Sequence, residues 1–99
     1  MKNGLYTFED DLKERLKDPE FRQAWQETEA EYLLAKEIIE KRLAKKYSQR
    51  DLATKVNTSQ AAISRIESMN ANPSLSFLKR IANALGETIT LNITPLPKP

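Results

Sequence analysis

The sequence contains neither cysteine nor histidine, and only two of its 99 residues are glycine. Without cysteine there is no disulfide framework and no thiolate zinc site, so a reducing cytoplasmic setting is compatible with the composition. Without histidine the chain lacks the commonest general base and the commonest metal ligand. The sequence also shows no glycine-rich phosphate loop and no metal-spaced carboxylates, so we expect no enzyme, no cofactor and no metal.

Long apolar runs are also missing from this chain. No run approaches the roughly 20 residues that a membrane-spanning helix needs. The first eleven residues, MKNGLYTFEDD, lack the apolar core of a signal peptide. We therefore expect a cytoplasmic protein without membrane contact. With 39% hydrophobic and 30% charged residues, the chain fits one small domain with an appended arm.

Charge is unevenly distributed along the chain. Residues 1–31 carry five basic and nine acidic side chains, a net charge of −4, whereas residues 32–99 carry eleven basic and five acidic ones, a net charge of +6. This asymmetry predicts two different partners, phosphate for the basic part and a basic protein for the acidic part. Two other interpretations remain open: the acidic arm lowers non-specific DNA binding, or it is an ordinary charged helical surface.

A short amphipathic helix is predicted near the N-terminus. Phe8, Leu12 and Leu16 recur every four residues, behind a Thr7 cap with Asp10 three residues later. This helix is too short to hold its shape without packing on something else.

A second helix is predicted to begin at Pro19, because proline favours the first turn of a helix. It places Phe21 and Trp25 on one stripe. A capping-box pattern at Thr28 suggests a break there and a third helix beyond it. One long helix as far as Lys46 is the alternative.

Two short helices are predicted between Ser48 and Glu67, in the stretch SQRDLATKVNTSQAAISRIE. The first begins at a Ser48 cap, and the second begins at a Thr58 or Ser59 cap. The turn between them contains Asn57, and asparagine tolerates a left-handed conformation better than other non-glycine residues. Helices joined so tightly cross steeply, which is the geometry of the helix-turn-helix that enters DNA major grooves.

The second of these helices turns four side chains outward that suit base edges: Gln60, Ala61, Ser64 and Arg65. Arginine can bridge guanine O6 and N7, and glutamine can do the same for adenine N6 and N7. We therefore predict that these four residues contact DNA bases. The alternative is an exposed polar face without a partner.

Phosphate contacts are predicted at helix starts and in the loop after the second helix, where free backbone N–H groups also point at phosphates. A cationic side chain beside them adds salt-dependent affinity. The residues of this set are Gln49, Arg50, Thr58, Ser59 and Asn72. The alternative for the two hydroxyl residues is that they serve only as helix caps.

The C-terminal residues change from a helical period to a period of two. A last helix begins at a Ser74 cap and ends at Gly86, after which Ile89, Leu91 and Ile93 alternate with polar residues. A lone strand needs a partner, so we expect it to pair with the same strand of a second copy across a dimer axis. Addition to the edge of a partner's sheet and packing on the chain's own helices are the alternatives. The expected fold is mainly α, with five to six helices and one C-terminal β-strand that pairs across a dimer.

The runs SQRDLATKV, SQAAISRIE and PSLSFLKRIANALG resemble the Xre/Cro/C1 repressor-type helix-turn-helix domain, over about Tyr32 to Gly86. The resemblance implies that Gln49 contacts a phosphate, that the four outward residues face the bases, and that Arg42 forms a structural ion pair with Glu67. Asn57 departs from the pattern, because family members usually have glycine there. The segment TITLNIT replaces the fifth helix through which many relatives dimerise, so their dimer geometry is not carried over.

The segment LKDPEFRQAWQETEAEY ahead of this domain is similar to the HigA-type antitoxins of bacterial toxin–antitoxin pairs. This resemblance implies a homodimer that neutralises a basic ribonuclease toxin of the HigB/RelE class and represses its own operon by binding double-stranded operator DNA. The acidic arm agrees with it. The alternative function is a stand-alone phage-type transcriptional repressor without a toxin partner.

The expected organisation has three parts: an acidic toxin-binding arm over 1–30, the helix-turn-helix domain over 31–86, and a dimerisation strand with a proline-rich tail over 87–99. Large apolar side chains are frequent interface anchors. The residues expected to contact the toxin are Phe8, Leu12, Leu16, Phe21 and Trp25, and those expected to pair in the dimer are Ile89, Leu91 and Ile93. The alternative for the first set is that its members pack together as core.

Overall fold

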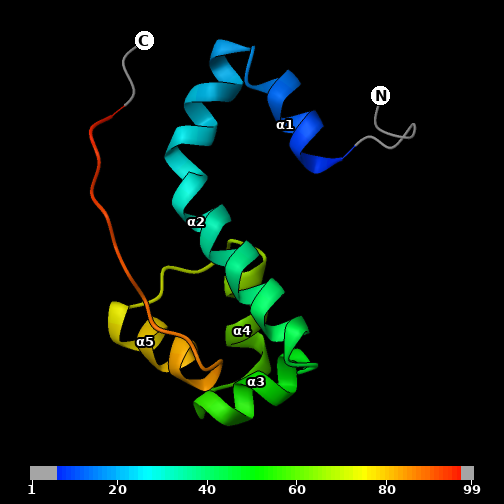
Figure 1. The fold of residues 1–99 in the computed structure, drawn as a ribbon, viewed down its shortest axis with the longest axis vertical. Helices are drawn as coiled ribbons and strands as arrows, with labels where there is room; N and C mark the ends of the chain where they lie inside the picture. The colour runs from blue at the N-terminus through cyan, green and yellow to red at the C-terminus, as the bar shows by residue number, and fades with distance from the viewer. Residues whose placement is uncertain (1–6, 97–99) are drawn as a thin grey trace. The chain divides into compact units, whose positions relative to one another are not determined.

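The computed structural model describes residues 7–96, without the side chain of Phe8. These residues form five α-helices and no β-strand (Figure 1). The helices are α1 (Phe8–Arg15), α2 (Pro19–Ala44), α3 (Gln49–Val56), α4 (Gln60–Glu67) and α5 (Leu75–Ala84). The mainly helical class is therefore confirmed. None of these helices is long and apolar enough to cross a membrane.

The chain divides into two compact units, residues 1–33 and residues 34–99. The first contains α1 and the beginning of α2. At the start of α1 the predicted cap forms, because the Asp10 N–H donates to Thr7 Oγ1 at 3.1 Å and the Thr7 N–H donates to Asp10 Oδ2 at 3.3 Å. Two amides at the helix start are thereby satisfied. The predicted functional division at residues 30 and 86 stays a prediction.

The predicted break near Thr28 is wrong, because α2 continues without interruption from Pro19 to Ala44. The Thr28 hydroxyl donates to the carbonyl oxygen of Ala24 at 3.1 Å, one helical turn earlier. A threonine that bonds back to the preceding turn sits inside a helix and caps nothing. The predicted start at Pro19 is confirmed, and the carboxylate of the preceding Asp18 accepts a hydrogen bond from the Glu20 N–H at 3.1 Å.

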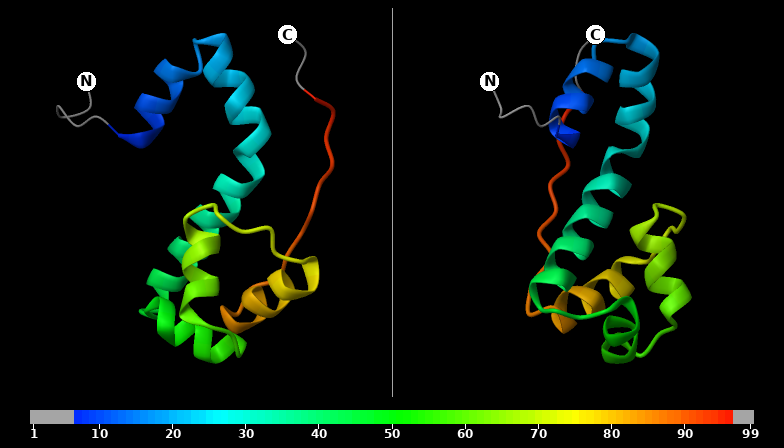
Figure 2. Two further views of the ribbon diagram at one scale, coloured as in Figure 1. Left: turned by 180° about the vertical axis from the view of Figure 1, so that it is seen from behind. Right: turned by 90° about the vertical axis from the view of Figure 1, so that its right-hand side faces the viewer.

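The hydrophobic core of the second unit has at its centre one side chain from each of the three short helices. Leu52 of α3, Ile63 of α4 and Ile81 of α5 are at most 1% exposed. The views in Figure 2 show these helices gathered beside the C-terminal part of α2, which contributes Ile38 to the same cluster. The cluster is completed by Ala53, Val56, Ile66 and Leu85. Helices of eight to ten residues are too short to be stable alone, so this packing holds them.

Four helices end in a residue with left-handed backbone conformation: Lys46 (φ 60°), Asn57 (φ 62°), Met69 (φ 65°) and Gly86 (φ 73°). After each of them, the next amide donates to the carbonyl oxygen five residues earlier, at 2.8–3.0 Å. This is the Schellman arrangement, which satisfies carbonyls at the helix end. Only one of the four residues is glycine, so three side chains carry the steric cost of a Cβ atom in this conformation.

The predicted C-terminal strand is not confirmed. Residues 87–96 carry no strand or helix, and their backbone leaves the helices of the second unit as an extended segment (Figure 2). Ile89 is half-buried, whereas Leu91 is 69% and Ile93 is 102% exposed. A strand is defined by hydrogen bonds to a neighbouring strand, and the described part of a single chain supplies none. Pairing with a second copy therefore stays a prediction.

Replacing Met69 by glycine should stabilise the protein, because glycine adopts the left-handed conformation without a Cβ clash. We expect Met69→Gly to raise the free energy of unfolding by about 1 kcal/mol in urea titrations. Met69→Ala is the matched control, since it removes the same side chain but keeps the Cβ atom. Equal stability of the two variants would show that backbone strain at this position is negligible.

Candidate functional site

Helix α4 presents its polar side to solvent and its apolar side to the core. It begins after a three-residue turn, where Ser59 Oγ accepts a hydrogen bond from the Ala62 N–H at 3.1 Å. Ser59 is therefore the cap, of the two residues considered from the sequence. Ile63 and Ile66 are buried. The residues predicted to contact bases lie outside this buried face: Gln60, Ala61 and Arg65 are exposed, and Ser64 is half-buried.

The end of α4 is joined to α2 by a bidentate ion pair between Arg42 and Glu67. Arg42 Nε lies 2.7 Å from Glu67 Oε2, and Arg42 Nη2 lies 3.0 Å from Glu67 Oε1. The third guanidinium nitrogen, Nη1, donates to the Tyr47 carbonyl oxygen at 2.8 Å. The side chains are only 11% and 6% exposed. One planar guanidinium thereby holds the loop before α3 and the last residue of α4 together.

Gln49, predicted to contact a phosphate, lies beside this ion pair. Its Nε2 donates to Glu67 Oε1 at 3.0 Å. Its Oε1 accepts a long hydrogen bond from Gln60 Nε2 at 3.5 Å, and Arg50 Nη2 lies 3.5 Å from Gln60 Oε1. The structure thus brings Gln49, Arg50 and Gln60 together at the start of α4. The two long contacts are weak, so the Gln60 amide is oriented loosely and stays available to a ligand.

The other predicted phosphate contacts lie at the edges of the same surface. Thr58 is half-buried in the turn before α4, and Ser59 is exposed beside it. The Ser59 oxygen already accepts the capping hydrogen bond, which leaves its O–H free to donate. Asn72 is exposed in the loop between α4 and α5. The structure therefore places these residues around α4 without bringing them into one cluster.

Arg80 of α5 has a role that sequence reasoning missed. Its Nη2 donates to the Val56 carbonyl oxygen at the end of α3, and its guanidinium carbon lies 5.5 Å from the centre of the Phe77 ring. A cation at a helix C-terminus is favourable against the negative end of the helix dipole. The two partners are 24 residues apart, so no local pattern in the sequence signals the contact.

The Ser48 cap of α3 affects the ionisation of Asp51. The Ser48 N–H donates to Asp51 Oδ2 at 2.8 Å, and the Asp51 N–H donates to Ser48 Oγ at 2.9 Å. The hydrogen bond from the Ser48 backbone, followed by that from its side chain, lowers the pKa of the Asp51 carboxyl below its ordinary value. The ionised Asp51 carboxylate therefore stabilises the folded state. This stabilisation is fully present above the unfolded-state pKa of Asp51 and is lost as the pH falls through its folded-state pKa.

Residues 38–92, more than half of the chain, match a family model described as helix-turn-helix. The chain belongs to the helix-turn-helix family. The match covers α3, α4 and α5, together with the surface described above, and it supports DNA binding. Searches of the curated proteins and of the solved structures found no match for this helix-turn-helix protein.

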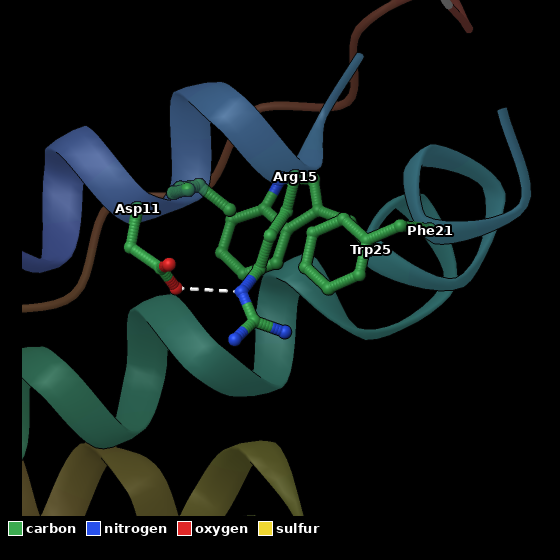
Figure 3. Close-up of a pocket in the computed structure, with 5 residues that line it drawn as sticks. Asp11, Arg15, Phe21 and Trp25 are labelled. Atoms are coloured by element: carbon green, nitrogen blue, oxygen red, sulfur yellow. Dashed lines mark hydrogen bonds and ion pairs between the residues drawn. The ribbon is translucent and has the colours of Figure 1, made fainter. Parts of the chain in front are cut away.

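The first unit of this helix-turn-helix protein has an open pocket of ≈ 310 Å³ lined by Asp11, Leu12, Arg15, Phe21 and Trp25. Figure 3 shows the Arg15 side chain beside the two aromatic rings, with Asp11 holding it. Arg15 Nε lies 2.6 Å from Asp11 Oδ2, and its guanidinium carbon lies 5.8 Å from the centre of the Phe21 ring. Leu12, Phe21 and Trp25 are half-buried, so they form neither a closed core nor a bare surface.

The other two residues predicted to contact the toxin are Leu16 and Phe8. Leu16 is half-buried but does not line the pocket, and the side chain of Phe8 lies outside the described part of the structure. The Trp25 ring packs at 56° against the Tyr32 ring, with centroids 5.0 Å apart. No group of three or more metal-ligating side chains is placed to hold an ion within residues 7–96.

Removing one partner of the buried ion pair should destabilise the protein strongly. Arg42→Met leaves the Glu67 carboxylate without its cation. We expect the free energy of unfolding, measured in urea titrations, to fall by about 3 kcal/mol. The double variant Arg42→Met/Glu67→Leu should recover most of that loss, because no buried charge remains. Lys36→Met, which breaks an exposed pair with Glu40, should cost less than about 1 kcal/mol. A double variant as unstable as the sum of its single variants would contradict this account.

Proposed function

We propose that this helix-turn-helix protein is the antitoxin of a toxin–antitoxin pair. Its second unit binds operator DNA and represses its own operon, and its first unit binds and neutralises a basic ribonuclease toxin of the HigB/RelE class. The observation that carries the DNA-binding half is the exposed side of α4, where Gln60 and Arg65 project from a helix whose opposite side is buried.

Base recognition on this proposal is divided between two long side chains. Arg65 donates in a fork to guanine O6 and N7, and Gln60 pairs with the N6 and N7 edge of adenine. Ala61 and Ser64 are small and allow the helix to lie close to the groove floor. The weak contacts of Gln60 with Gln49 and Arg50, at 3.5 Å each, favour an amide that is pre-oriented but exchangeable for a base edge.

Phosphate contacts on this proposal anchor α4 on both sides. Arg50 and the exposed N-terminus of α3 lie at one side, and Asn72 lies in the loop beyond the other end of α4. Backbone amides at the starts of α3 and α4 attract phosphate because the positive end of each helix dipole lies there. Two copies related by a two-fold axis would place two α4 helices about 34 Å apart and read a palindromic operator.

The toxin-binding half rests on charge and on the open pocket of the first unit. Residues 1–31 carry a net charge of −4, from nine acidic and five basic side chains. A net negative field steers a basic partner and accelerates its association. The half-buried Leu12, Phe21 and Trp25 offer apolar anchors beside that charge. This surface lies in a different compact unit from α4.

The second candidate is a stand-alone transcriptional repressor of the phage type. The half-burial of Leu12, Phe21 and Trp25 favours it, since side chains that cover one another also suit a purely structural arm. The genomic neighbourhood separates the two. An adjacent reading frame for a small basic protein that co-purifies with this chain supports the antitoxin, and the absence of any such complex supports the stand-alone repressor.

Truncating Arg65 should weaken and relax operator recognition. We expect Arg65→Ala to lose about 1–3 kcal/mol of binding free energy and to lose its preference at one base pair. Fluorescence anisotropy with labelled DNA from upstream of the reading frame measures both effects at fixed salt. Arg22→Ala, an exposed arginine of the first unit, is the control for loss of one positive charge. If Arg65→Ala has the same affinity as Arg22→Ala for operator DNA, and also the same affinity for scrambled DNA, α4 does not read bases through Arg65.

Reversing exposed acids of α1 should slow association with a basic toxin. Glu9 and Glu14 are suited to reversal because, unlike Asp10, neither caps the helix. We expect Glu9→Lys/Glu14→Lys to bind the product of the neighbouring reading frame about tenfold more slowly at low salt, and the deficit to shrink as salt is raised. Stopped-flow fluorescence of Trp25 follows the reaction.

The matched control places the same charge change in the second unit, as Glu37→Lys/Glu40→Lys. Both residues are exposed on α2. This variant should associate at nearly the parent rate, because the steering field of the first unit is unchanged. Equal slowing by the two double variants would mean that net charge alone matters and that the first unit is not the docking site.

A further inference from the structure

The segment Thr88–Thr94, with the sequence TITLNIT, displays large apolar side chains that the rest of its own unit leaves uncovered. Leu91 is 69% exposed and Ile93 is 102% exposed, and Ile89 is half-buried. In an extended chain these three side chains point to one side and the threonines and asparagine point to the other. An extended, exposed segment with one apolar face is a template for pairing with another strand.

The start of this segment is tied to the helices. The Glu87 N–H donates to the Ala82 carbonyl oxygen at 2.8 Å, which closes the end of α5. The Glu87 carboxylate lies 3.1 Å from the Lys41 ammonium of α2. The hydrogen bond to Glu87 and the negative charge of Glu87 raise the pKa of Lys41. The segment therefore begins at a fixed point on the second unit. If it pairs with a second copy, this pairing sets the spacing between the two second units.

The residue types of the segment are symmetric about Leu91. Thr90 and Asn92 flank it, then Ile89 and Ile93, then Thr88 and Thr94. An antiparallel pair of identical strands around a two-fold axis places each residue opposite the one equally far on the other side of the axis. With the axis at Leu91, every apolar residue faces an apolar residue and every polar residue faces a polar one.

Neighbouring registers lose this match. A shift of one residue places Leu91 opposite Thr90 and mixes polar with apolar side chains on both faces. A shift of two residues in one direction places Ile93 opposite Glu87. The same shift in the other direction places Ile89 opposite Pro95, which has no N–H for the ladder. The pattern therefore specifies one register among those available.

We propose that Thr88–Thr94 of two copies form a two-stranded antiparallel ribbon with Leu91 on the two-fold axis. This deepens the homodimer in the proposed function by naming its contact residues and register. The pattern favours a second copy as the partner of this segment. A sequence that is symmetric about one residue matches its own antiparallel copy, and pairing with an unrelated strand does not require this symmetry. The described residues contain no other strand that this segment could join.

The absence of cysteine from the chain makes a disulfide scan direct. Opposed residues of an antiparallel pair have Cα atoms about 4.5–5.5 Å apart, within disulfide reach. Leu91→Cys should therefore give a covalent dimer under mild oxidation on a non-reducing gel. Ile89→Cys alone and Ile93→Cys alone should not cross-link and should run as monomers on the denaturing gel, because each cysteine lies four residues, roughly 13 Å, from the same cysteine of the second copy. A mixture of these two variants, one carrying a size tag, should give the mixed dimer.

Each other result overturns the proposal. Dimers from all three single variants indicate parallel or random contact, and dimers from Thr90→Cys or Asn92→Cys in place of Leu91→Cys indicate another register. Leu96→Cys, at a residue that is 86% exposed and lies two positions beyond the segment, reports random collision. No dimer from Leu91→Cys excludes the ribbon and leaves the segment for another protein's sheet. The scan needs neither DNA nor toxin, so operator binding that persists without cross-linking rejects the ribbon alone.

Discussion

The ion pair between Arg42 and Glu67 is the contact on which the surface proposed to bind DNA depends. It joins α2 to the last residue of α4, and the same guanidinium binds the Tyr47 carbonyl just before α3. Its carboxylate also accepts from the Gln49 amide, whose other end meets Gln60. Charges so far removed from water add little net stability. The pair instead restricts how α4 can be placed, and the described residues contain no buried side-chain polar atom without a hydrogen bond.

Apolar packing and short caps complete what the ion pair begins. Helices α3 and α4 have eight residues each, too few to persist outside a fold. Leu52 and Ile63 are fully buried between them, and Asn57 provides the left-handed residue that turns one helix into the next. On the proposed function, a rigidly held α4 matters for specificity, because side chains on a loosely held helix can meet several base patterns. This packing outweighs the steric cost of the left-handed backbone conformation at Lys46 and Met69.

The two units divide charge and chemistry between them. The N-terminal part is acidic and has an open pocket lined in part by Phe21 and Trp25. The remainder is basic and contains the exposed side of α4 with Gln60 and Arg65. On the proposed function this division lets a single chain bind polyanionic DNA and a cationic protein, each through a field of opposite sign. The continuous α2 connects the two units as one element of secondary structure.

Local chemistry was sufficient to predict most of the elements. The capping boxes at Thr7 and Ser48, the left-handed Asn57 and the apolar spacing of each helix act over three or four residues, so the sequence alone determined them. Thr28 carried the same local pattern, yet its hydroxyl bonds back within a continuous helix, because flanking turns outweigh a single cap. Only the tertiary structure showed that Gln49 binds Glu67 and that Arg80 reaches Val56, since these partners lie 18 and 24 residues apart. The period-two pattern after Gly86 predicts a strand from the sequence. A strand exists only through hydrogen bonds to another strand, so whether this one forms depends on a second chain.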